Sequence, residues 1–266
     1  MNSHAQKKRN IIWDLSGTLF KPSSAGLSIQ ELADYSLVFY MWSGKTEPSK
    51  LDTYALKLID QAAEPSSKYQ SIRTHTGSPV PTLICMLLAG LISSEDAYKK
   101  VMQALQNKEQ NTQHNLNSTE IAQAHRIIKA FFDPLVLARC MKPIKISTEL
   151  VIQCSQNPLN TLYVISNWDA QSYAYLLQTY AGEAPLSYIP FNNILISADS
   201  GFIKPQAEIY DFFLAKYKLD PNTCFFIDDQ KENIEGAQTR DIDGIQFKIN
   251  DSVKLTRILK ALNIIL

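Results

Sequence analysis

The second half of the chain alternates short apolar runs with stretches of helical periodicity. The runs are short and rich in β-branched and aromatic residues, as buried strands are. Four of them occur, at residues 161–165, 193–196, 224–227 and 245–249. Residues 173–180 and 255–262 carry apolar side chains at the i, i+3, i+4, i+7 spacing of a helix face. This alternation predicts an α/β fold, a parallel sheet with helices on both faces.

The first half of the chain has a different hydrophobic pattern. One apolar strand is predicted at residues 10–14, and the sequence that follows has helical periodicity almost throughout, as at Leu51, Tyr54, Ala55 and Leu58. Because the first strand has no strand partner nearby, we expect it to join the sheet of the second half. Residues 1–20 and 142–266 are then predicted to form one core domain, and residues 21–141 a helical domain inserted into it.

Composition narrows the possible partners. The chain has 266 residues, of which 45% are hydrophobic and 20% are charged, which is typical of a globular protein. Its 26 basic and 26 acidic residues give a net charge of zero, so no general attraction to nucleic acid or to an anionic membrane is expected. The longest apolar run, residues 83–92, is too short for a membrane span, which needs about 20 residues.

The cysteines and the N-terminus favour a cytoplasmic location. The four cysteines are far apart and lack the spacing of a zinc site, so we expect four buried thiols in a reducing compartment (Cys85, Cys140, Cys154 and Cys224). The basic residues near the N-terminus are not followed by the apolar segment of a secretory signal.

Polar side chains follow the predicted strands at their carboxyl ends, where parallel sheets bind ligands. Asp14 follows the first strand and could attack phosphorus. The Asp228-Asp229 pair follows a later strand and supplies the hard oxygen ligands that Mg²⁺ prefers. Ser166 and Lys204 also follow strands and could donate to phosphoryl oxygens.

Four sequence segments, in this order, resemble the motifs of the haloacid dehalogenase-like hydrolases. They are IIWDLSGTL (residues 11–19), LYVISN (162–167), GFIKPQAEIY (201–210) and CFFIDDQKENIEGA (224–237). The resemblance implies a Rossmann-like core with an inserted helical cap. It also implies a Mg²⁺-dependent phosphatase that acts on a small phosphorylated substrate.

The resemblance further implies roles for individual residues. Asp14 would be the nucleophile, and Thr18 would order the loop around it. The Mg²⁺ ligands would be Asp14, the backbone carbonyl of Ser16 and Asp228, with Asp229 acting directly or through water. Ser166, the backbone of Asn167 and Lys204 would neutralise the phosphoryl oxygens.

One position departs from that pattern. The phosphatases of the family usually have a second Asp two positions after the nucleophile, as general acid and base, and here that residue is Ser16. This favours a phosphatase whose substrate has a good leaving group, such as a sugar 1-phosphate or an acyl phosphate, or one that borrows an acid from the cap. Some relatives that resemble sugar-1-phosphatases also lack this Asp. The alternatives are a phosphonatase- or dehalogenase-type enzyme, and a catalytically idle domain that binds a phosphorylated ligand or a protein.

Overall fold

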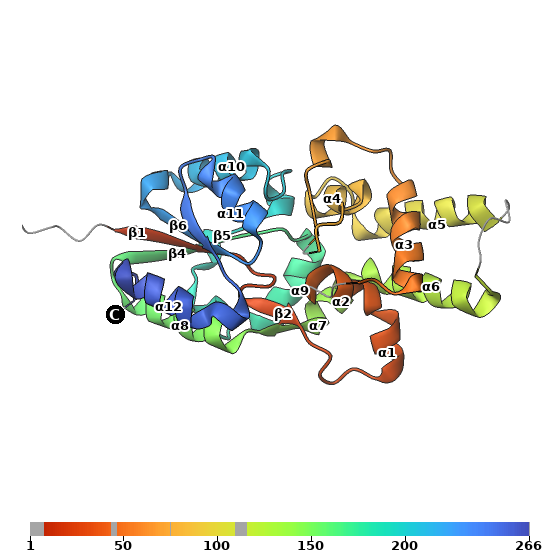
Figure 1. The fold of residues 1–266 in the computed structure, drawn as a ribbon, viewed down its shortest axis with the longest axis horizontal. Helices are drawn as coiled ribbons and strands as arrows, with labels where there is room; N and C mark the ends of the chain where they lie inside the picture. The colour runs from red at the N-terminus through yellow and green to blue at the C-terminus, as the bar shows by residue number, and fades with distance from the viewer. Residues whose placement is uncertain (1–7, 44–46, 75, 110–115, 266) are drawn as a thin grey trace, which may run out of the picture. The chain divides into compact units, whose positions relative to one another are not determined.

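The computed structural model describes residues 8–43, 47–74, 76–109 and 116–265 (Figure 1). The chain divides into two compact units. Unit 1 comprises Met1–Lys21, Lys142–Asn167 and Leu177–Leu266, and unit 2 comprises Pro22–Met141 and Trp168–Leu176.

A five-stranded parallel sheet forms the centre of unit 1. The strands lie in the order β5-β4-β1-β6-β7, which places the strand from the N-terminus in the middle. They are β1 (Arg9–Trp13), β4 (Asn160–Ser166), β5 (Ile194–Ile196), β6 (Cys224–Asp228) and β7 (Asp243–Gln246). The prediction of an α/β fold with a parallel sheet is therefore confirmed.

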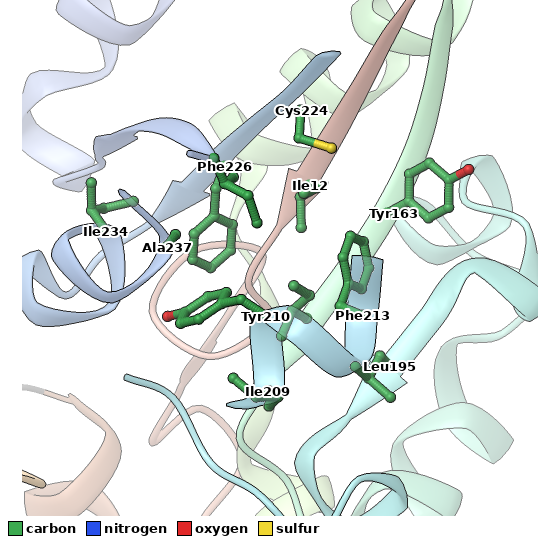
Figure 2. Close-up of a cluster of buried hydrophobic side chains, with 12 residues drawn as sticks. Ile12, Tyr163, Leu195, Ile209, Tyr210, Phe213, Cys224, Phe226, Ile234 and Ala237 are labelled. Atoms are coloured by element: carbon green, nitrogen blue, oxygen red, sulfur yellow. The ribbon is translucent and has the colours of Figure 1, made fainter. Parts of the chain in front are cut away.

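Helices cover both faces of this sheet. On one face lie α10 (Ala207–Tyr217) and α11 (Lys231–Gln238), and on the other α8 (Lys145–Gln156) and α12 (Ser252–Ala261) (Figure 1). Figure 2 shows the apolar cluster under α10 and α11, in which Tyr210 and Phe213 of α10 pack with Ile12 and Phe226 of the sheet. Burial of these large side chains holds α10 over the middle of the sheet.

Unit 2 is helical. Its helix α3 (Lys50–Gln61) buries Ala55 and Leu58 from the predicted apolar stripe. In a capping box at its first turn, the Ser49 side chain accepts from Asp52 N and the Asp52 side chain accepts from Ser49 N. Its helices are α1 (Ile29–Asp34), α2 (Ser36–Ser43), α3 (Lys50–Gln61), α4 (Thr82–Leu88), α5 (Ser94–Glu109), α6 (Ser118–Phe131) and α7 (Pro134–Cys140), together with the first part of α9 (Ala170–Tyr180).

The structure differs from the sequence-based expectation in three details. The segment Trp168–Leu176, expected with the core, groups with unit 2, where Trp168 is fully buried. The strand expected at residues 245–249 lies at Asp243–Gln246, since its pairing with β6 stops where β6 ends, opposite Asp228. A two-stranded sheet of β2 (Phe20–Pro22) and β3 (Met141–Pro143), which was not predicted, forms where the chain leaves and re-enters unit 1.

All four cysteines are buried and none forms a disulfide, as expected. Among the described residues, no helix combines the length and the apolar character that crossing a membrane requires.

Candidate active site

Three neighbouring strands of unit 1 end side by side and carry the predicted site residues. Trp13, at the end of β1, pairs with Val164 of β4 on one side and Ile227 of β6 on the other. The next residue, Asp14, therefore lies level with the ends of both neighbours, and its backbone N–H donates to Ile227 O at 3.0 Å. The register of the parallel sheet thus brings together side chains more than 200 positions apart in the sequence.

Three carboxylates meet at this edge. Asp14, Asp228 and Asp229 each offer an oxygen that lies within 4.8 Å of the other two. Asp14 and Asp228 are buried, and Asp229 is half-buried. Gly17 in the loop after β1 has a φ of +86°, and a Cβ at this position would collide with the Asp229 carboxylate. Glycine therefore meets two needs here, a left-handed backbone and the close approach of Asp229.

The Lys204 ammonium lies between two of these carboxylates. Its Nζ is 2.6 Å from Asp14 Oδ1 and 2.6 Å from Asp228 Oδ2, and it also donates to the Ile165 carbonyl at 3.0 Å. The lysine is only 2% exposed. Burial by itself lowers the pKa of Lys204, but the two carboxylates outweigh it and leave that pKa raised. Lys204 is therefore a fixed positive charge inside the acidic cluster.

The same surroundings shift the pKa values of the carboxylic acids. Burial raises the pKa of Asp14 to about 6, against the opposing effect of Lys204. The pKa of Asp229 is also raised, by burial first and then by the charges of Asp228 and Asp14. Shifts of this kind, in which like charges share a buried site, are typical of catalytic and metal-binding carboxylates.

Ser166 fixes the side chain of Asp14. Its Oγ donates to Asp14 Oδ1 at 2.8 Å and accepts a longer hydrogen bond, 3.4 Å, from Leu15 N. Lys204 binds the same Asp14 oxygen, so both donors hold Oδ1. The carboxylate is thus oriented through Oδ1 by Ser166 at the end of β4 and by Lys204 in the loop before α10.

Asp228 accepts hydrogen bonds from the start of α11, the helix that follows β6, as well as from Lys204. Gln230 N donates to Asp228 Oδ1 at 2.8 Å, and the Asn233 side chain donates to both carboxylate oxygens at 3.0 Å. Sequence reasoning gave Asn233 no role, although it lies in the quoted segment at residues 224–237. Its position five residues after Asp228, in the first turn of α11, was the available signal.

The remaining predicted residues lie nearby in unit 1. The Asn167 side chain binds the backbone of Lys204. Ser16 pairs with Phe20 in an isolated bridge, and its carbonyl as a magnesium ligand remains a prediction. Thr18 is fully buried, and its Oγ1 has no hydrogen-bond partner among the described residues. The loop is instead ordered by backbone bonds, in which Leu19 N and Phe20 N both donate to the carbonyl of Leu15.

A family comparison agrees with this fold. The model of the haloacid dehalogenase-like hydrolases matches residues 8–239, and the chain belongs to that family. No curated protein matches the chain significantly.

Solved structures show the same fold at low sequence identity. A haloacid dehalogenase (HAD) family enzyme from Bacteroides thetaiotaomicron superposes with a TM-score of 0.56 at 14% identity, over 91% of this chain and 95% of that one. A complex of that enzyme with magnesium and inorganic phosphate gives a TM-score of 0.54 at 15% identity, with the same coverage. A HAD-like family hydrolase from Porphyromonas gingivalis gives 0.52 at 17% identity, over 96% and 99% of the two chains.

Proposed function

We propose that this protein is a Mg²⁺-dependent phosphomonoesterase that acts through an aspartyl-phosphate on Asp14. The observation that carries the proposal is the arrangement around Asp14 within unit 1, where Ser166 and Lys204 both bind Oδ1 and two further carboxylates lie within 4.8 Å. An oriented carboxylate beside a fixed cation is suited to attack on a phosphoryl group.

The donor set fits magnesium. The cluster offers hard carboxylate oxygens from three residues, and its one buried ammonium leaves negative charge in excess. Asp14, Asp228, Asp229 and the Ser16 carbonyl would hold the ion. When bound, magnesium supplies positive charge that offsets the carboxylates and the phosphoryl oxygens.

The residues of the chain would carry two displacements at phosphorus. In the first, Asp14 Oδ2 bonds to phosphorus, and the bond between phosphorus and the leaving oxygen breaks. In the second, water bonds to phosphorus, the bond to Asp14 breaks, and phosphate leaves. Lys204, Ser166 and the Asn167 backbone N–H would neutralise the phosphoryl oxygens, so that catalysis rests mainly on position and charge.

Ser16 bears on the choice of substrate. The leaving oxygen needs a proton unless it is stable as an anion, and a serine hydroxyl does not supply that proton near neutral pH. We therefore propose a small cytoplasmic metabolite with a good leaving group, such as a sugar 1-phosphate or an acyl phosphate.

The test is a panel of phosphorylated metabolites with free-phosphate release as readout. Wild-type protein with Mg²⁺ is expected to release phosphate from at least one ester, and Asp14→Asn from none. Beryllium fluoride with Mg²⁺ is expected to form an adduct on Asp14, seen by ¹⁹F NMR. Binding of a panel member without any turnover would instead favour the idle, ligand-binding domain.

A further inference from the structure

Lys204 makes hydrogen bonds to the carboxyl end of β4 through its side chain and, by way of Asn167, through its backbone. At the tip of the side chain, Nζ donates to the carbonyl of Ile165, the last but one residue of β4. At the backbone, Lys204 N donates to Asn167 Oδ1 at 2.8 Å, and Asn167 Nδ2 donates to Lys204 O at 3.0 Å. One carboxamide therefore satisfies both backbone polar groups of the residue that carries the ammonium.

A contact of this kind restricts orientation as well as distance. Two hydrogen bonds in opposite directions, from one planar amide to one residue, fix how that residue's backbone faces the strand. The direction of the Lys204 side chain is therefore set by backbone contacts that do not involve the carboxylates. The loop itself is kept in shape by Gln206, whose Oε1 accepts from Ile203 N at 2.9 Å.

The same strand end positions the nucleophile. Ser166 binds Asp14, and the next residue, Asn167, binds Lys204. The two side chains thus relate the Asp14 carboxylate and the Lys204 ammonium to one short piece of β4. Because Nζ lies 2.6 Å from Asp14 Oδ1, a small shift of the Lys204 backbone would break this contact.

We propose that Asn167 is a positioning residue, whose side chain orients the Lys204 ammonium toward Asp14 and Asp228. This role is separate from that of the Asn167 backbone N–H toward phosphate. Only its kinetic consequence rests on the proposed function, since the contact itself belongs to the protein without ligand.

The test compares Asn167→Ala with a matched asparagine at the other end of β4. Asn160 also donates to two backbone carbonyls, those of Cys154 and Ile264, but lies away from the site. Asn160→Ala therefore removes a similar pair of bonds without touching Lys204. Asn167→Asp keeps the shape and the acceptor for Lys204 N but removes the donor to Lys204 O, and serves if the alanine variant does not fold.

The first readout is acetylation of Lys204 by acetic anhydride, followed by mass spectrometry, with the exposed Lys231 as internal reference. We expect Lys204 to be protected in wild type and in Asn160→Ala, and to be acetylated about tenfold faster in Asn167→Ala. Asn167→Asp should lie between. The proposal would be overturned if Lys204 were equally protected in wild type and in both Asn167 variants. It would also be overturned if Asn160→Ala lost as much protection of Lys204 as Asn167→Ala.

The second readout is hydrolysis of p-nitrophenyl phosphate. We expect kcat/KM to fall about tenfold in Asn167→Ala and to stay at the wild-type value in Asn160→Ala, at similar unfolding temperatures. An equal fall in both would mean that the effect is only structural and would count against the proposal. If wild type hydrolyses no ester, the proposed function fails, while the acetylation comparison still decides the role of Asn167.

Discussion

Asn233 donates its side-chain N–H groups to both carboxylate oxygens of Asp228, each at 3.0 Å. Both residues are buried, and the backbone carbonyl of Asn233 accepts from the Tyr210 hydroxyl at 2.7 Å. This network ties the proposed magnesium ligand to α11 and, through Tyr210, to α10. Buried carboxylates are costly unless their oxygens are bound, so the two Asn233 donors offset part of the cost of burying the Asp228 side chain.

Asn233→Ala is therefore expected to weaken magnesium binding, because Asp228 loses two of its donors. Loss of a residue that orients a metal ligand typically lowers affinity about 10- to 100-fold. Isothermal titration calorimetry with MgCl₂ measures the effect. Asn222→Ala, which removes an exposed side-chain bond to Asp220, is the control and should bind like wild type. Unchanged affinity in Asn233→Ala would show that Asp228 does not depend on this contact.

Lys204→Met is expected to destabilise the metal-free protein by about 3–5 kcal/mol, because it leaves buried carboxylates without their cation. The free energy of unfolding in urea with EDTA measures this. Added Mg²⁺ should restore more stability to the variant than it adds to wild type, since it supplies the missing charge. The control is Lys231→Met, which breaks an exposed pair with Glu235 and should leave the free energy of unfolding unchanged. A metal-free Lys204→Met as stable as wild type would contradict the proposed charge balance.

Ser16→Asp is expected to raise turnover most on esters with poor leaving groups. The new carboxyl group could protonate the leaving oxygen, a contribution of roughly 10²–10⁴ in rate where that step limits. An alkyl phosphate should therefore gain much more in kcat than p-nitrophenyl phosphate, whose leaving group needs no proton. The two substrates serve as each other's control. An equal gain on both would show that general acid catalysis is not what the wild type lacks.

The thiols of Cys85, Cys154 and Cys224 are expected to be unreactive at pH 8 in the folded protein. Burial raises the pKa of Cys85 and Cys154 to about 12 and that of Cys224 to about 11. Because only the thiolate reacts, and its fraction grows only as the pH approaches the raised pKa, little reaction occurs below that range. Ellman's reagent should therefore detect none of these three thiols in the folded protein and all four cysteines in guanidinium. Rapid modification of folded protein at pH 8 would contradict their burial.

Much of this molecule follows from local sequence pattern. The short apolar runs predicted the sheet, and the i, i+3, i+4, i+7 stripes predicted helices such as α3, because both periods are properties of the chain segment itself. Asp14, Ser166 and Asp228 were found because they directly follow strands, and strand ends of a parallel sheet share one edge. Residue types and their order were thus enough to predict the members of the cluster.

Only the tertiary structure decided which atoms meet. The position of Lys204 between Asp14 and Asp228, the carboxamide of Asn167 on the Lys204 backbone and the hold of Asn233 on Asp228 depend on strand register and loop path. The grouping of Trp168–Leu176 with the helical unit is of the same kind. A periodic pattern records the segment's own conformation and the side it buries. Hydrogen bonds between residues as far apart as Asp14 and Lys204 arise only when packing brings those segments together.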